Sequence, residues 1–386
     1  MRKWIVFTAG IALVAVFFGI ALWDKGGDDR AQSNLVAVAA APDLSGFARA
    51  TGPKIWQFPQ DFGPHPNFQT EWWYYTGNLE ASSGEHFGYQ LTFFRRALLP
   101  PQELPRRSSD WATAQIYMAH FALTDVSAKQ YKAYERLERG AAGLAGAQSE
   151  PFQVWLDNWQ VEQVKPGSYH LDAQEGDVSV DLNLEETLGP ILQGDQGYSR
   201  KGPEPGQASY YYSLVHLKTQ GEIYSSGRTY QVNGLSWMDH EFSTSALGKN
   251  QVGWDWFALQ LDDGSALMVY QIRQTDGSAG PFSSGSWITP DGRKINLSQS
   301  DFSIQVHDTW TSPKSGARYP SAWTIQVPKA GLQMEVKPYL ANQELNVSYS
   351  YWEGAVQVVG RREGQPVSGS GYVELTGYSA SMSGEF

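Results

Sequence analysis

Beyond residue 51, apolar and polar residues alternate along much of the chain, in short runs separated by turn-forming residues. Alternation with a period of two is typical of β-strands, because successive side chains of a strand point to opposite faces of a sheet. One segment, Gln130–Arg139, is a candidate for a short helix. The clearest alternating runs predict strands at residues 86–96, 114–125, 177–186, 209–219 and 227–238.

The composition supports a mainly β protein. Aromatic residues make up 13% of the 386 residues, and 39 glycines and 20 prolines are spread along the chain. Aromatic residues favour strands, whereas frequent glycine and proline interrupt long helices. The length exceeds that of one typical domain. We therefore expect an all-β fold of two domains.

Two distant segments resemble each other. Residues 71–95 read EWWYYTGNLEASSGEHFGYQLTFFR, and residues 253–273 read GWDWFALQLDDGSALMVYQIR. Each has an aromatic cluster, a strand that ends in leucine, a turn with glycine, and a second strand with a Tyr-Gln pair and an arginine. Such a repeat predicts one β-hairpin in each of two related β units.

The N-terminus predicts export and a contact with a membrane. Arg2 and Lys3 precede an uncharged run of twenty residues, Trp4–Trp23. About 20 residues span a bilayer, whereas the apolar part of a cleavable signal has about 7–15. The length favours an uncleaved anchor, while the small residues of Ala37–Asp43 leave cleavage open. Because basic residues stay on the cytoplasmic side, we expect everything after Asp24 to be exported.

These features divide the chain into four parts. Residues 1–23 form the anchor or signal. Residues 24–50 are rich in Ala, Gly, Asp and Ser without apolar periodicity, which is typical of a linker. The two β units then occupy residues 51–240 and 241–386, so the boundary falls beside a cluster of charged residues.

The composition also excludes several kinds of chemistry. There are no cysteines, which removes disulfides, thiolate metal sites and a cysteine nucleophile. The net charge of −11 argues against binding to nucleic acid, which needs clustered Lys and Arg. The seven histidines show no tight ligand spacing, so a metal site would have to be assembled from separate strands. We expect no bound metal ion. Glycine-rich nucleotide loops are also missing, and we expect no cofactor.

One acid followed by four aromatic residues is the first motif with candidate chemistry. The acid is Glu71, and the aromatic residues are Trp72, Trp73, Tyr74 and Tyr75. In a strand, Trp72 and Tyr74 share one face and the other three residues share the opposite face. Core packing explains each ring by itself. Glu71 has two interpretations: a salt bridge to Arg95 or Arg96, or a carboxyl group with a raised pKa.

The second motif is GLSWMDHEFS, residues 234–243, near the boundary of the two β units. It places Asp239, His240 and Glu241 between Trp237 and Phe242. Three ionisable groups in an apolar stretch are costly to bury unless they pair, bind a metal or transfer protons. The aromatic neighbours indicate partial burial and favour a functional role, and a turn with solvated charges is the alternative.

An aromatic-rich β structure with few buried acids suits a long apolar or polyunsaturated ligand. An acid can protonate a C=C bond, and aromatic rings can stabilise the resulting cation until water adds. We assign this acid–base chemistry to Asp239, His240, Glu241 and Glu71, and expect Glu71 to share the cavity of Asp239. We expect the ligand to contact eight aromatic side chains: Trp72, Trp73, Tyr74, Tyr210, Tyr212, Trp237, Trp254 and Trp256.

Eight segments together are similar to one known family: PHPNFQTEWWYYTGNL, GYQLTFFRR, MAHFALTD, GLSWMDHEFS, GWDWFALQLDDGSALMVYQIR, SPKSGARYPSAWTIQVP, YWEGAVQVVG and GSGYVELTGY. They resemble, in the same order from Ile55 to Tyr378, the AttH-like, carotenoid 1,2-hydratase-like family of exported proteins. The resemblance implies two lipocalin-like antiparallel β-barrels side by side. It also implies a position on the periplasmic side of the inner membrane and association with the permease of an ABC transporter.

The resemblance further implies a reaction. In the hydratase branch, an acid in a Y-x-D-H-N-like stretch protonates the terminal isoprene double bond. Asp239 and His240 match this stretch, which gives Asp239 the role of the acid. Trp237 and Glu241 stand where that branch has Tyr and Asn. A hydratase acting on C=C bonds is the leading hypothesis, and a non-catalytic lipid or lipoprotein carrier that serves an ABC transporter is the alternative.

Overall fold

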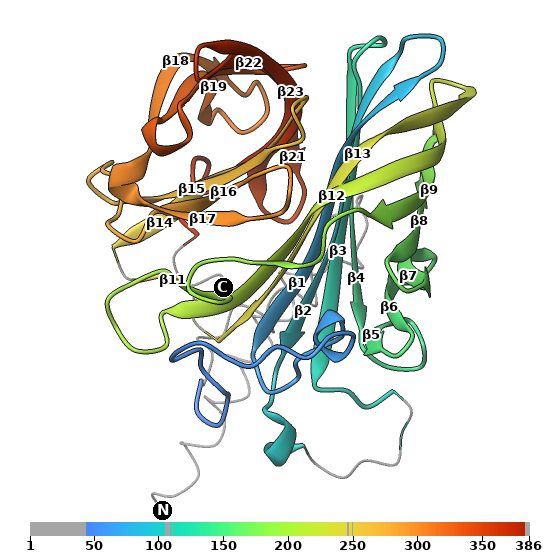
Figure 1. Cartoon of the computed structure of the whole chain (residues 1–386). Coiled ribbons are helices and arrows are strands. Elements are labelled where there is room, and N and C mark those ends of the chain that lie inside the picture. The colour runs from blue at the N-terminus through green and yellow to red at the C-terminus, as the bar shows by residue number, and fades with distance from the viewer. Residues whose placement is uncertain (1–43, 105–108, 110, 245–246, 249, 383–386) are drawn as a thin grey trace, which may run out of the picture. The chain divides into compact units, whose positions relative to one another are not determined.

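The computed structural model describes residues 44–104, 109, 111–244, 247–248 and 250–382 (Figure 1). Most of these residues belong to two antiparallel β-sheets, each of which curls around a core of its own, so the predicted all-β fold of two lipocalin-like barrels is confirmed. None of the helices in the described ranges is long and apolar enough to span a membrane. The predicted anchor at residues 1–23 lies outside these ranges. The described helical structure consists of short 3₁₀ turns: η1 (Gln60–Phe62), η2 (Pro101–Glu103), η3 (Gln299–Asp301) and η4 (Pro328–Ala330).

The first sheet has 13 strands in the order β4-β3-β2-β1-β13-β12-β9-β8-β7-β6-β5, and β10 and β11 pair with β12. Its strands are β1 (Thr70–Ala81), β2 (His86–Ala97), β3 (Gln115–Asp125), β4 (Gln130–Arg139), β5 (Ala145–Ser149), β6 (Phe152–Leu156), β7 (Trp159–Lys165), β8 (Ser168–Glu175), β9 (Val178–Glu186), β10 (Ile191–Leu192), β11 (Tyr198–Arg200), β12 (Ala208–Ser225) and β13 (Arg228–Ser243).

The second sheet has 10 strands in the order β17-β16-β15-β14-β23-β22-β20-β19-β18, and β21 pairs with β22. Its strands are β14 (Gln251–Leu261), β15 (Ala266–Gln274), β16 (Ser284–Ile288), β17 (Lys294–Ser298), β18 (Ser303–Thr311), β19 (Arg318–Val327), β20 (Leu332–Pro338), β21 (Glu344–Asn346), β22 (Ser350–Arg362) and β23 (Gln365–Leu375).

The two hairpins that resemble each other in sequence occupy equivalent positions. In the first sheet β1 pairs with β2 on one side and with the last strand, β13, on the other. In the second sheet β14 likewise pairs with β15 and with the last strand, β23. The first strand of each barrel therefore pairs with both the second strand and the last strand of the same barrel, which confirms the predicted repeat.

The five predicted strands correspond to β2, β3, β9, β12 and β13, but the predicted helix between Gln130 and Arg139 is wrong. That segment is β4 and pairs with β3 along its whole length. Its Tyr134 side chain packs against the core of the first barrel. Pairing along a full neighbouring strand outweighs a local helical preference, which is worth only a few tenths of a kcal/mol per residue, roughly, for most residues.

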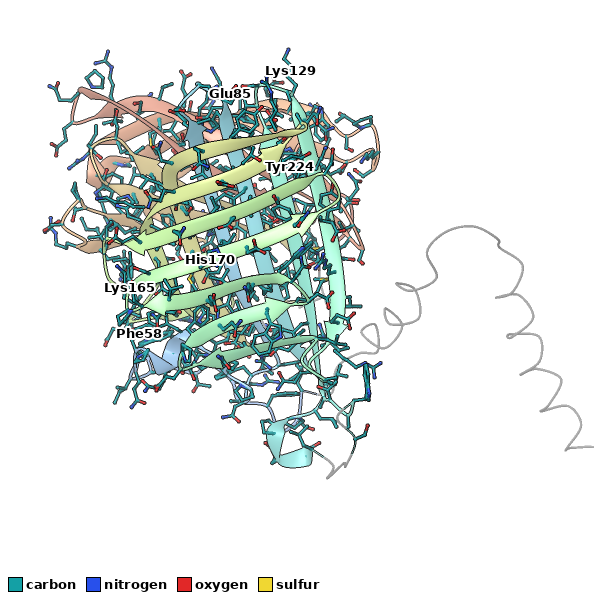
Figure 2. All side chains as sticks on the ribbon, turned by 90° about the vertical axis from the view of Figure 1, so that its right-hand side faces the viewer. Phe58, Glu85, Lys129, Lys165, His170 and Tyr224 are labelled. Atoms are coloured by element: carbon teal, nitrogen blue, oxygen red, sulfur yellow. The ribbon has the colours of Figure 1, made fainter. Side chains whose placement is uncertain are left out.

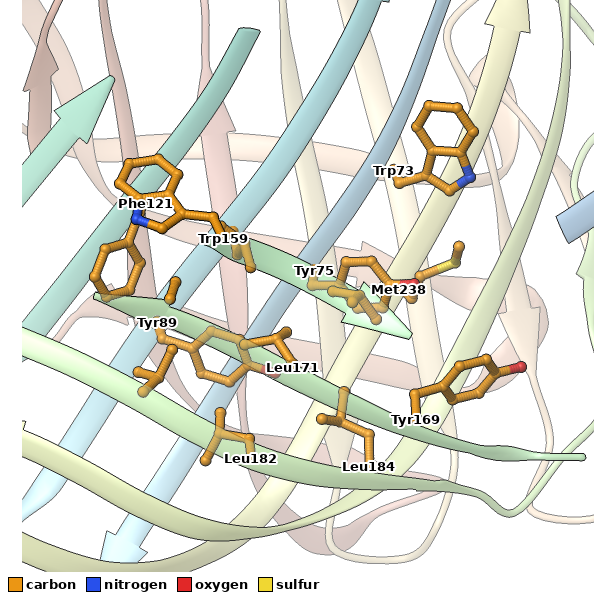
Figure 3. Packing of buried hydrophobic residues seen from close by; sticks show 14 of the residues in the cluster. Trp73, Tyr75, Tyr89, Phe121, Trp159, Tyr169, Leu171, Leu182, Leu184 and Met238 are labelled. Carbon is orange, nitrogen blue, oxygen red and sulfur yellow. The ribbon is translucent and has the colours of Figure 1, made fainter. Parts of the chain in front are cut away.

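Alternation along the strands separates the core of the first barrel from its surface. The inner face carries a cluster that includes Trp73, Tyr75 and Trp159, shown at close range in Figure 3. On β8, Leu171 belongs to this core, whereas the preceding His170 lies on the outer face (Figure 2). The second barrel has its own core around residues such as Trp323 and Trp352.

The chain before β1 packs onto the first barrel. Phe47 and Ala50, in the last part of the expected linker, are buried. The Trp56 indole N–H donates to the Gln196 carbonyl at 2.9 Å. Phe58 and Phe62 pack on each other, with ring centroids 4.8 Å apart, and Phe62 belongs to the barrel core. The segment before Thr70 is therefore part of the folded unit.

A third apolar cluster joins the two barrels, with members from β1, β12 and β13 on one side and from β14, β15, β22 and β23 on the other. Hydrogen bonds also cross this interface. The Asn78 amide donates to the Gly371 carbonyl at 2.9 Å, and the Gln260 amide donates to the Val215 carbonyl at 2.7 Å. The barrels meet over a packed surface that is partly polar.

Gly88 lies at a close approach of the two barrels. A Cβ atom at Gly88 would lie 2.4 Å from the Cβ atom of Ala355 on β22. We expect Gly88→Ala to lower the free energy of unfolding by about 1–3 kcal/mol, because overpacking forces the neighbouring strands apart. Gly52→Ala is the control, since no atom lies within 4 Å of its added Cβ. Urea denaturation measures both variants, and equal stability of the two would contradict this account of the interface.

Candidate active site

Strand β13 carries the Asp-His-Glu motif through the middle of the first sheet, between β1 and β12. Because side chains alternate along a strand, Asp239 and Glu241 point to one face and His240 points to the other. Asp239 lies opposite Tyr74 of β1, and His240 lies opposite Trp73. The motif therefore contributes to two separate clusters, one between the barrels and one inside the first barrel.

The cluster between the barrels surrounds a cavity. The cavity volume is about 90 Å³, measured as the space open to the centres of water-sized molecules. Nine of its nineteen lining residues are aromatic, and four carboxyl groups and one lysine line it as well. These lining residues include Trp72, Tyr74, Phe94, Tyr211, Trp254, Trp256, Tyr270, Tyr351, Asp239, Glu241, Glu353, Glu374 and Lys201.

Asp239 is held in place by three hydrogen-bond donors. Its Oδ1 atom accepts from the Ser213 hydroxyl at 2.5 Å and from the Trp237 indole N–H at 2.7 Å. Its Oδ2 atom accepts from the Tyr211 hydroxyl at 2.7 Å. Burial raises the pKa of Asp239 to about 7, although these three hydrogen bonds act in the opposite direction. Asp239 can therefore gain or lose a proton near neutral pH.

Two further carboxyl groups come from the second barrel, Glu353 on β22 and Glu374 on β23. Burial raises the pKa of Glu374 to about 7, although its Oε2 atom accepts from the Trp254 indole N–H at 2.6 Å. Burial and the neighbouring Glu374 raise the pKa of Glu353 well above its ordinary value. Neither oxygen of Glu353 has a partner at hydrogen-bonding geometry among the described residues, although the Tyr74 and Tyr351 hydroxyls lie near enough to moderate its pKa. Burial without a hydrogen-bond donor therefore favours the neutral form of the Glu353 carboxyl group.

The fourth acid of the cavity, Glu241, forms an ion pair. Its Oε1 atom lies 3.3 Å from the Lys201 ammonium group. Burial lowers the pKa of Lys201, but the charge of Glu241 and the Tyr270 hydroxyl raise it more, so the pKa lies above its ordinary value. The ammonium group also lies 4.2 Å from the centre of the Tyr270 ring. This pair keeps one positive and one negative charge at the cavity wall.

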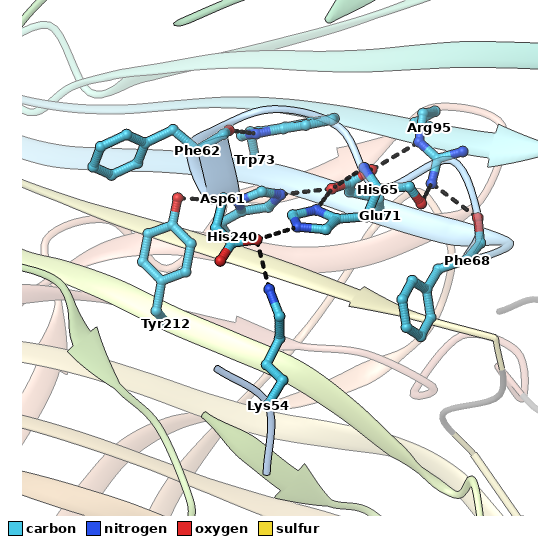
Figure 4. Close-up of polar contacts among 10 residues, drawn as sticks. All are labelled: Lys54, Asp61, Phe62, His65, Phe68, Glu71, Trp73, Arg95, Tyr212 and His240. Atoms are coloured by element: carbon cyan, nitrogen blue, oxygen red, sulfur yellow. Dashed lines mark hydrogen bonds and ion pairs between the residues drawn. The ribbon is translucent and has the colours of Figure 1, made fainter. Parts of the chain in front are cut away.

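The second cluster lies inside the first barrel around the buried carboxylate of Glu71 (Figure 4). The His65 Nδ1 and His240 Nε2 atoms each lie 2.8 Å from its Oε1 atom. The Arg95 Nε–H donates to its Oε2 atom at 2.8 Å. The Asp61 Oδ1 atom lies 2.9 Å from the other ring nitrogen of His65. We call these five residues the Glu71 network.

The contacts of the Glu71 network determine its protonation. His65 places one ring nitrogen against each of two carboxylates, so both nitrogens carry a proton and the ring is positively charged. Although burial lowers the pKa of His65, the charge of Glu71 and the bond to Asp61 raise it above its ordinary value overall. His240 places its Nδ1 atom 3.0 Å from the Tyr212 hydroxyl, which can donate to it. Burial lowers the pKa of His240, so this ring is neutral.

A metal ion is a poor fit to the Glu71 network. Among the described residues, His65, Glu71 and His240 are the one group whose potential ligand atoms all lie within 4.8 Å of one another. All four ring nitrogens and both oxygens of Glu71 already have partners, and Arg95 places a positive charge beside the carboxylate. An added cation would have to displace these bonds and approach two positive charges. We interpret the network as a structural ion-pair cluster.

The structure separates residues that the sequence grouped together. Glu71 and His240 lie in the Glu71 network and are absent from the cavity wall, so the expectation that Glu71 shares the cavity of Asp239 is wrong. The salt-bridge interpretation of Glu71, with Arg95 as its partner, is confirmed. The reason is the alternation of β13, which directs neighbours in sequence to opposite faces.

The eight predicted aromatic contacts divide in the same way. Four of them line the cavity: Trp72, Tyr74, Trp254 and Trp256. Trp237 reaches the cavity through its hydrogen bond to Asp239. The other three lie on the opposite face: Trp73 is in the barrel core, the Tyr210 hydroxyl donates to the Gly52 carbonyl, and Tyr212 contacts His240. On β12 the cavity residue is Tyr211, between the two tyrosines that were predicted.

Sequence reasoning missed Tyr211, Lys201, Glu353 and Glu374. Tyr211 could have been found by register, because it pairs with Glu241 in the neighbouring strand β13. Glu353 and Glu374 each stand in an apolar, β-rich run, which is a signal of a buried acid. Lys201 has no such signal, since it lies in a loop rich in Gly and Pro.

Two lipocalin-like barrels with an acidic, aromatic cavity between them define a class of two-barrel β proteins. The chain belongs to the AttH-like family, which matches residues 49–378. A crystal structure of a putative AttH from Nitrosomonas europaea has a TM-score of 0.77 and 36% sequence identity, and the match covers 86% of this chain and 99% of that chain.

Two enzymes are also similar to the chain. Kievitone hydratase from Nectria haematococca shares the fold, with a TM-score of 0.64 and 15% identity over 88% of this chain and 98% of that chain. The dehydratase asqC of Emericella nidulans is 23% identical over 210 residues, which cover 51% of this chain and 58% of that protein. The match thus spans little more than half the length of that curated relative.

The Glu71 network predicts a pH dependence of stability. The pKa of His65 is raised in the folded state, so its contribution is complete below the unfolded pKa of about 6.5 and is lost as the pH rises through the folded pKa. The pKa of Glu71 is lowered, so its contribution is present above about 4.5 and is lost as the pH falls. We expect urea denaturation to show a loss on the order of 1 kcal/mol between mildly acidic and alkaline pH.

His65→Gln tests this prediction, because glutamine cannot carry the proton. The variant should be less stable than the unmodified protein at mildly acidic pH and should show a flatter alkaline decline. His170→Gln is the matched control, since His170 pairs with Asp181 on the outer face of the first barrel. An equal alkaline decline in His65→Gln and in the unmodified protein would remove His65 from this explanation.

Proposed function

We propose that the protein is a hydro-lyase-like enzyme, which adds water to a C=C bond of an apolar ligand or removes water to form one. The observation that carries the proposal is the cavity between the barrels, where carboxyl groups that can hold a proton near neutral pH face aromatic rings. Similarity to a dehydratase and to a hydratase supports the same reaction class.

Glu353 is the better proton donor of the cavity, although the sequence suggested Asp239 for this role. The oxygens of Glu353 have no partner at hydrogen-bonding geometry among the described residues, and burial raises its pKa well above the ordinary value. Asp239 already accepts three hydrogen bonds and ionises near pH 7. Two carboxyl groups in such different environments are the usual arrangement of an acid and a base in one site. We therefore assign the acid to Glu353 and the base to Asp239.

In the hydration direction, Glu353 transfers its proton to one carbon of the double bond. The other carbon becomes cationic, and the faces of cavity rings such as Trp72 and Trp256 stabilise this charge. Water then attacks the cation while the Asp239 carboxylate takes a proton from the attacking water. After one turnover the ligand has gained one water molecule, Glu353 lacks a proton and Asp239 holds an extra one. Dehydration follows the same steps in reverse.

The ligand in this proposal is an apolar molecule with at least one C=C bond, such as an isoprenoid or polyene. A wall rich in aromatic rings suits such a molecule, and the ion pair of Glu241 and Lys201 can orient a polar end of it. The names of the relatives do not single out a carotenoid.

The alternative from the sequence is a lipid or lipoprotein carrier associated with an ABC transporter. The apolar wall of the cavity suits a carrier as well as an enzyme, but a carrier does not need buried acids with raised pKa values. Export to the periplasmic side, the N-terminal anchor and the transporter permease as a partner remain predictions from the sequence.

Two substitutions test the assignment of acid and base. Glu353→Gln and Asp239→Asn should each lower kcat by about 10²- to 10⁴-fold, because each removes one positioned proton-transfer group. Ligand retention should be nearly unchanged. The assay is incorporation of isotopically labelled water into compounds of an apolar cell extract, followed by mass spectrometry. Trp73→Phe is the control, since Trp73 lies on the face turned away from the cavity.

The pH profile distinguishes the two possible roles of Asp239. As a base in hydration, Asp239 must be ionised, so kcat should rise with pH through about 7. As the acid, it must be protonated, so kcat should fall with pH through the same value. A falling profile would return the acid role to Asp239, and labelled water that never enters a bound ligand would favour the carrier.

A further inference from the structure

A chain of three polar side chains leads from the cavity wall to the surface. Tyr351 lines the cavity and is 2% exposed. Its hydroxyl lies 2.7 Å from the Nδ1 atom of His120, which is fully buried. The Nε2 atom of His120 lies 3.0 Å from the Oε2 atom of Glu135, whose side chain is 15% exposed. The chain crosses between the barrels, because His120 and Glu135 lie on β3 and β4 and Tyr351 lies on β22.

The order of groups fixes the direction of the hydrogen bonds. Hydrogen bonds from His120 and Ser348 lower the pKa of Glu135 despite its partial burial, so Glu135 is ionised at neutral pH. A carboxylate only accepts, so the Nε2 atom of His120 carries a proton. In the neutral form of the imidazole the Nδ1 atom then accepts from the Tyr351 hydroxyl. Carboxylate, imidazole and hydroxyl in this order form the arrangement that lets an imidazole take a proton from a hydroxyl.

The cavity end of the chain lies beside Glu353, although the Tyr351 hydroxyl is not at hydrogen-bonding geometry with it. Tyr351 and Glu353 are two residues apart on β22, so their side chains point to the same face. The Tyr351 hydroxyl and the Glu353 carboxyl group influence each other's pKa directly. Phe94 and Tyr349 pack around the His120 ring, which leaves the surroundings of the chain apolar.

We propose that Glu135, His120 and Tyr351 form a proton relay that connects Glu353 with the solvent. The relay rests on the proposed function, in which Glu353 must release a proton after each dehydration. The Nε2 proton of His120 passes to the Glu135 carboxylate as the Nδ1 atom takes the proton of the Tyr351 hydroxyl. The tyrosine oxygen takes the proton of Glu353 in the same exchange. Glu353 loses one proton, Glu135 gains one that it gives to solvent, Tyr351 ends as a hydroxyl, and His120 ends as the other neutral tautomer.

The concerted exchange follows from the chemistry of the tyrosine. Burial, and next to it the neighbouring Glu353, raise the pKa of Tyr351 well above its ordinary value, so a free tyrosinate would not form at neutral pH. The hydroxyl can therefore pass a proton only when it receives one at the same time. A hydroxyl hydrogen-bonded to an imidazole on one side and facing a carboxyl group on the other meets this requirement.

Proton exchange into deuterium oxide tests the relay without any substrate. Infrared spectroscopy follows the C=O stretching band of the neutral Glu353 carboxyl group, which is identified by its loss in Glu353→Gln. We expect Glu135→Gln, His120→Gln and Tyr351→Phe each to slow deuterium exchange of this band about tenfold or more. This factor is smaller than the rate enhancement of about 10²- to 10⁴-fold that a positioned proton-transfer group typically contributes. Exchange without substrate keeps this test separate from the test of turnover.

His86→Gln is the matched control. His86 bonds to Asn78 at 3.0 Å and stacks on Tyr339, so it is another histidine at the interface of the barrels, but it forms no hydrogen bond with Tyr351. Exchange should be unchanged in this variant, whereas a purely structural effect at the interface would slow or speed both histidine variants alike. If His120→Gln does not fold, Glu135→Gln and Tyr351→Phe decide the outcome.

Two results would overturn the relay. One is unchanged exchange of the Glu353 band in folded Glu135→Gln and Tyr351→Phe proteins, which would mean that the proton enters through the mouth of the cavity. The other is the absence of a Glu353-dependent band at neutral pH, because the relay would then have no neutral acid to serve. When turnover is also measured, the relay variants should lower kcat and leave KM unchanged.

Discussion

The buried carboxylate of Glu71 is the constraint around which the first barrel is organised. A charge with no exposed side-chain surface is tolerated only when its neighbours replace the hydrogen bonds of water. Those neighbours come from separate parts of the chain: His65 from the segment before β1, Arg95 from β2 and His240 from β13. One carboxylate therefore fixes the relative positions of three strands and of the segment that packs beside them.

The same strand that supplies His240 also supplies Asp239, and this links the Glu71 network to the cavity. Since β13 is held on one face by the hydrogen bonds of His240 to Glu71 and Tyr212, its other face has little freedom to move. A carboxyl group whose pKa depends on three donors needs such a rigid support, because a small displacement would lengthen all three bonds. The Glu71 network inside the first barrel thus helps to hold Asp239 in place at the cavity between the barrels.

The sequence predicted the strands and the repeat because both are local patterns. It also separated the faces of β1 correctly, with Trp72 and Tyr74 directed away from Glu71. It failed where an argument used closeness along the chain: Asp239 and His240 are neighbours in sequence but belong to different clusters. Tyr211 was missed because the register of β12 against β13 is not visible in either strand alone. Glu353 and Glu374 come from strands more than a hundred residues further on, so no local pattern could bring them to Asp239.

The internal repeat has a consequence for how such a protein can change over time. The two barrels contain similar hairpins, yet they supply different acids to the cavity between them. Asp239 and Glu241 come from the first barrel, and Glu353 and Glu374 come from the second. Neither half contains a complete site, so one half cannot keep the original function while the other evolves a new one. A change of ligand therefore requires compatible substitutions in both barrels, on both sides of their interface.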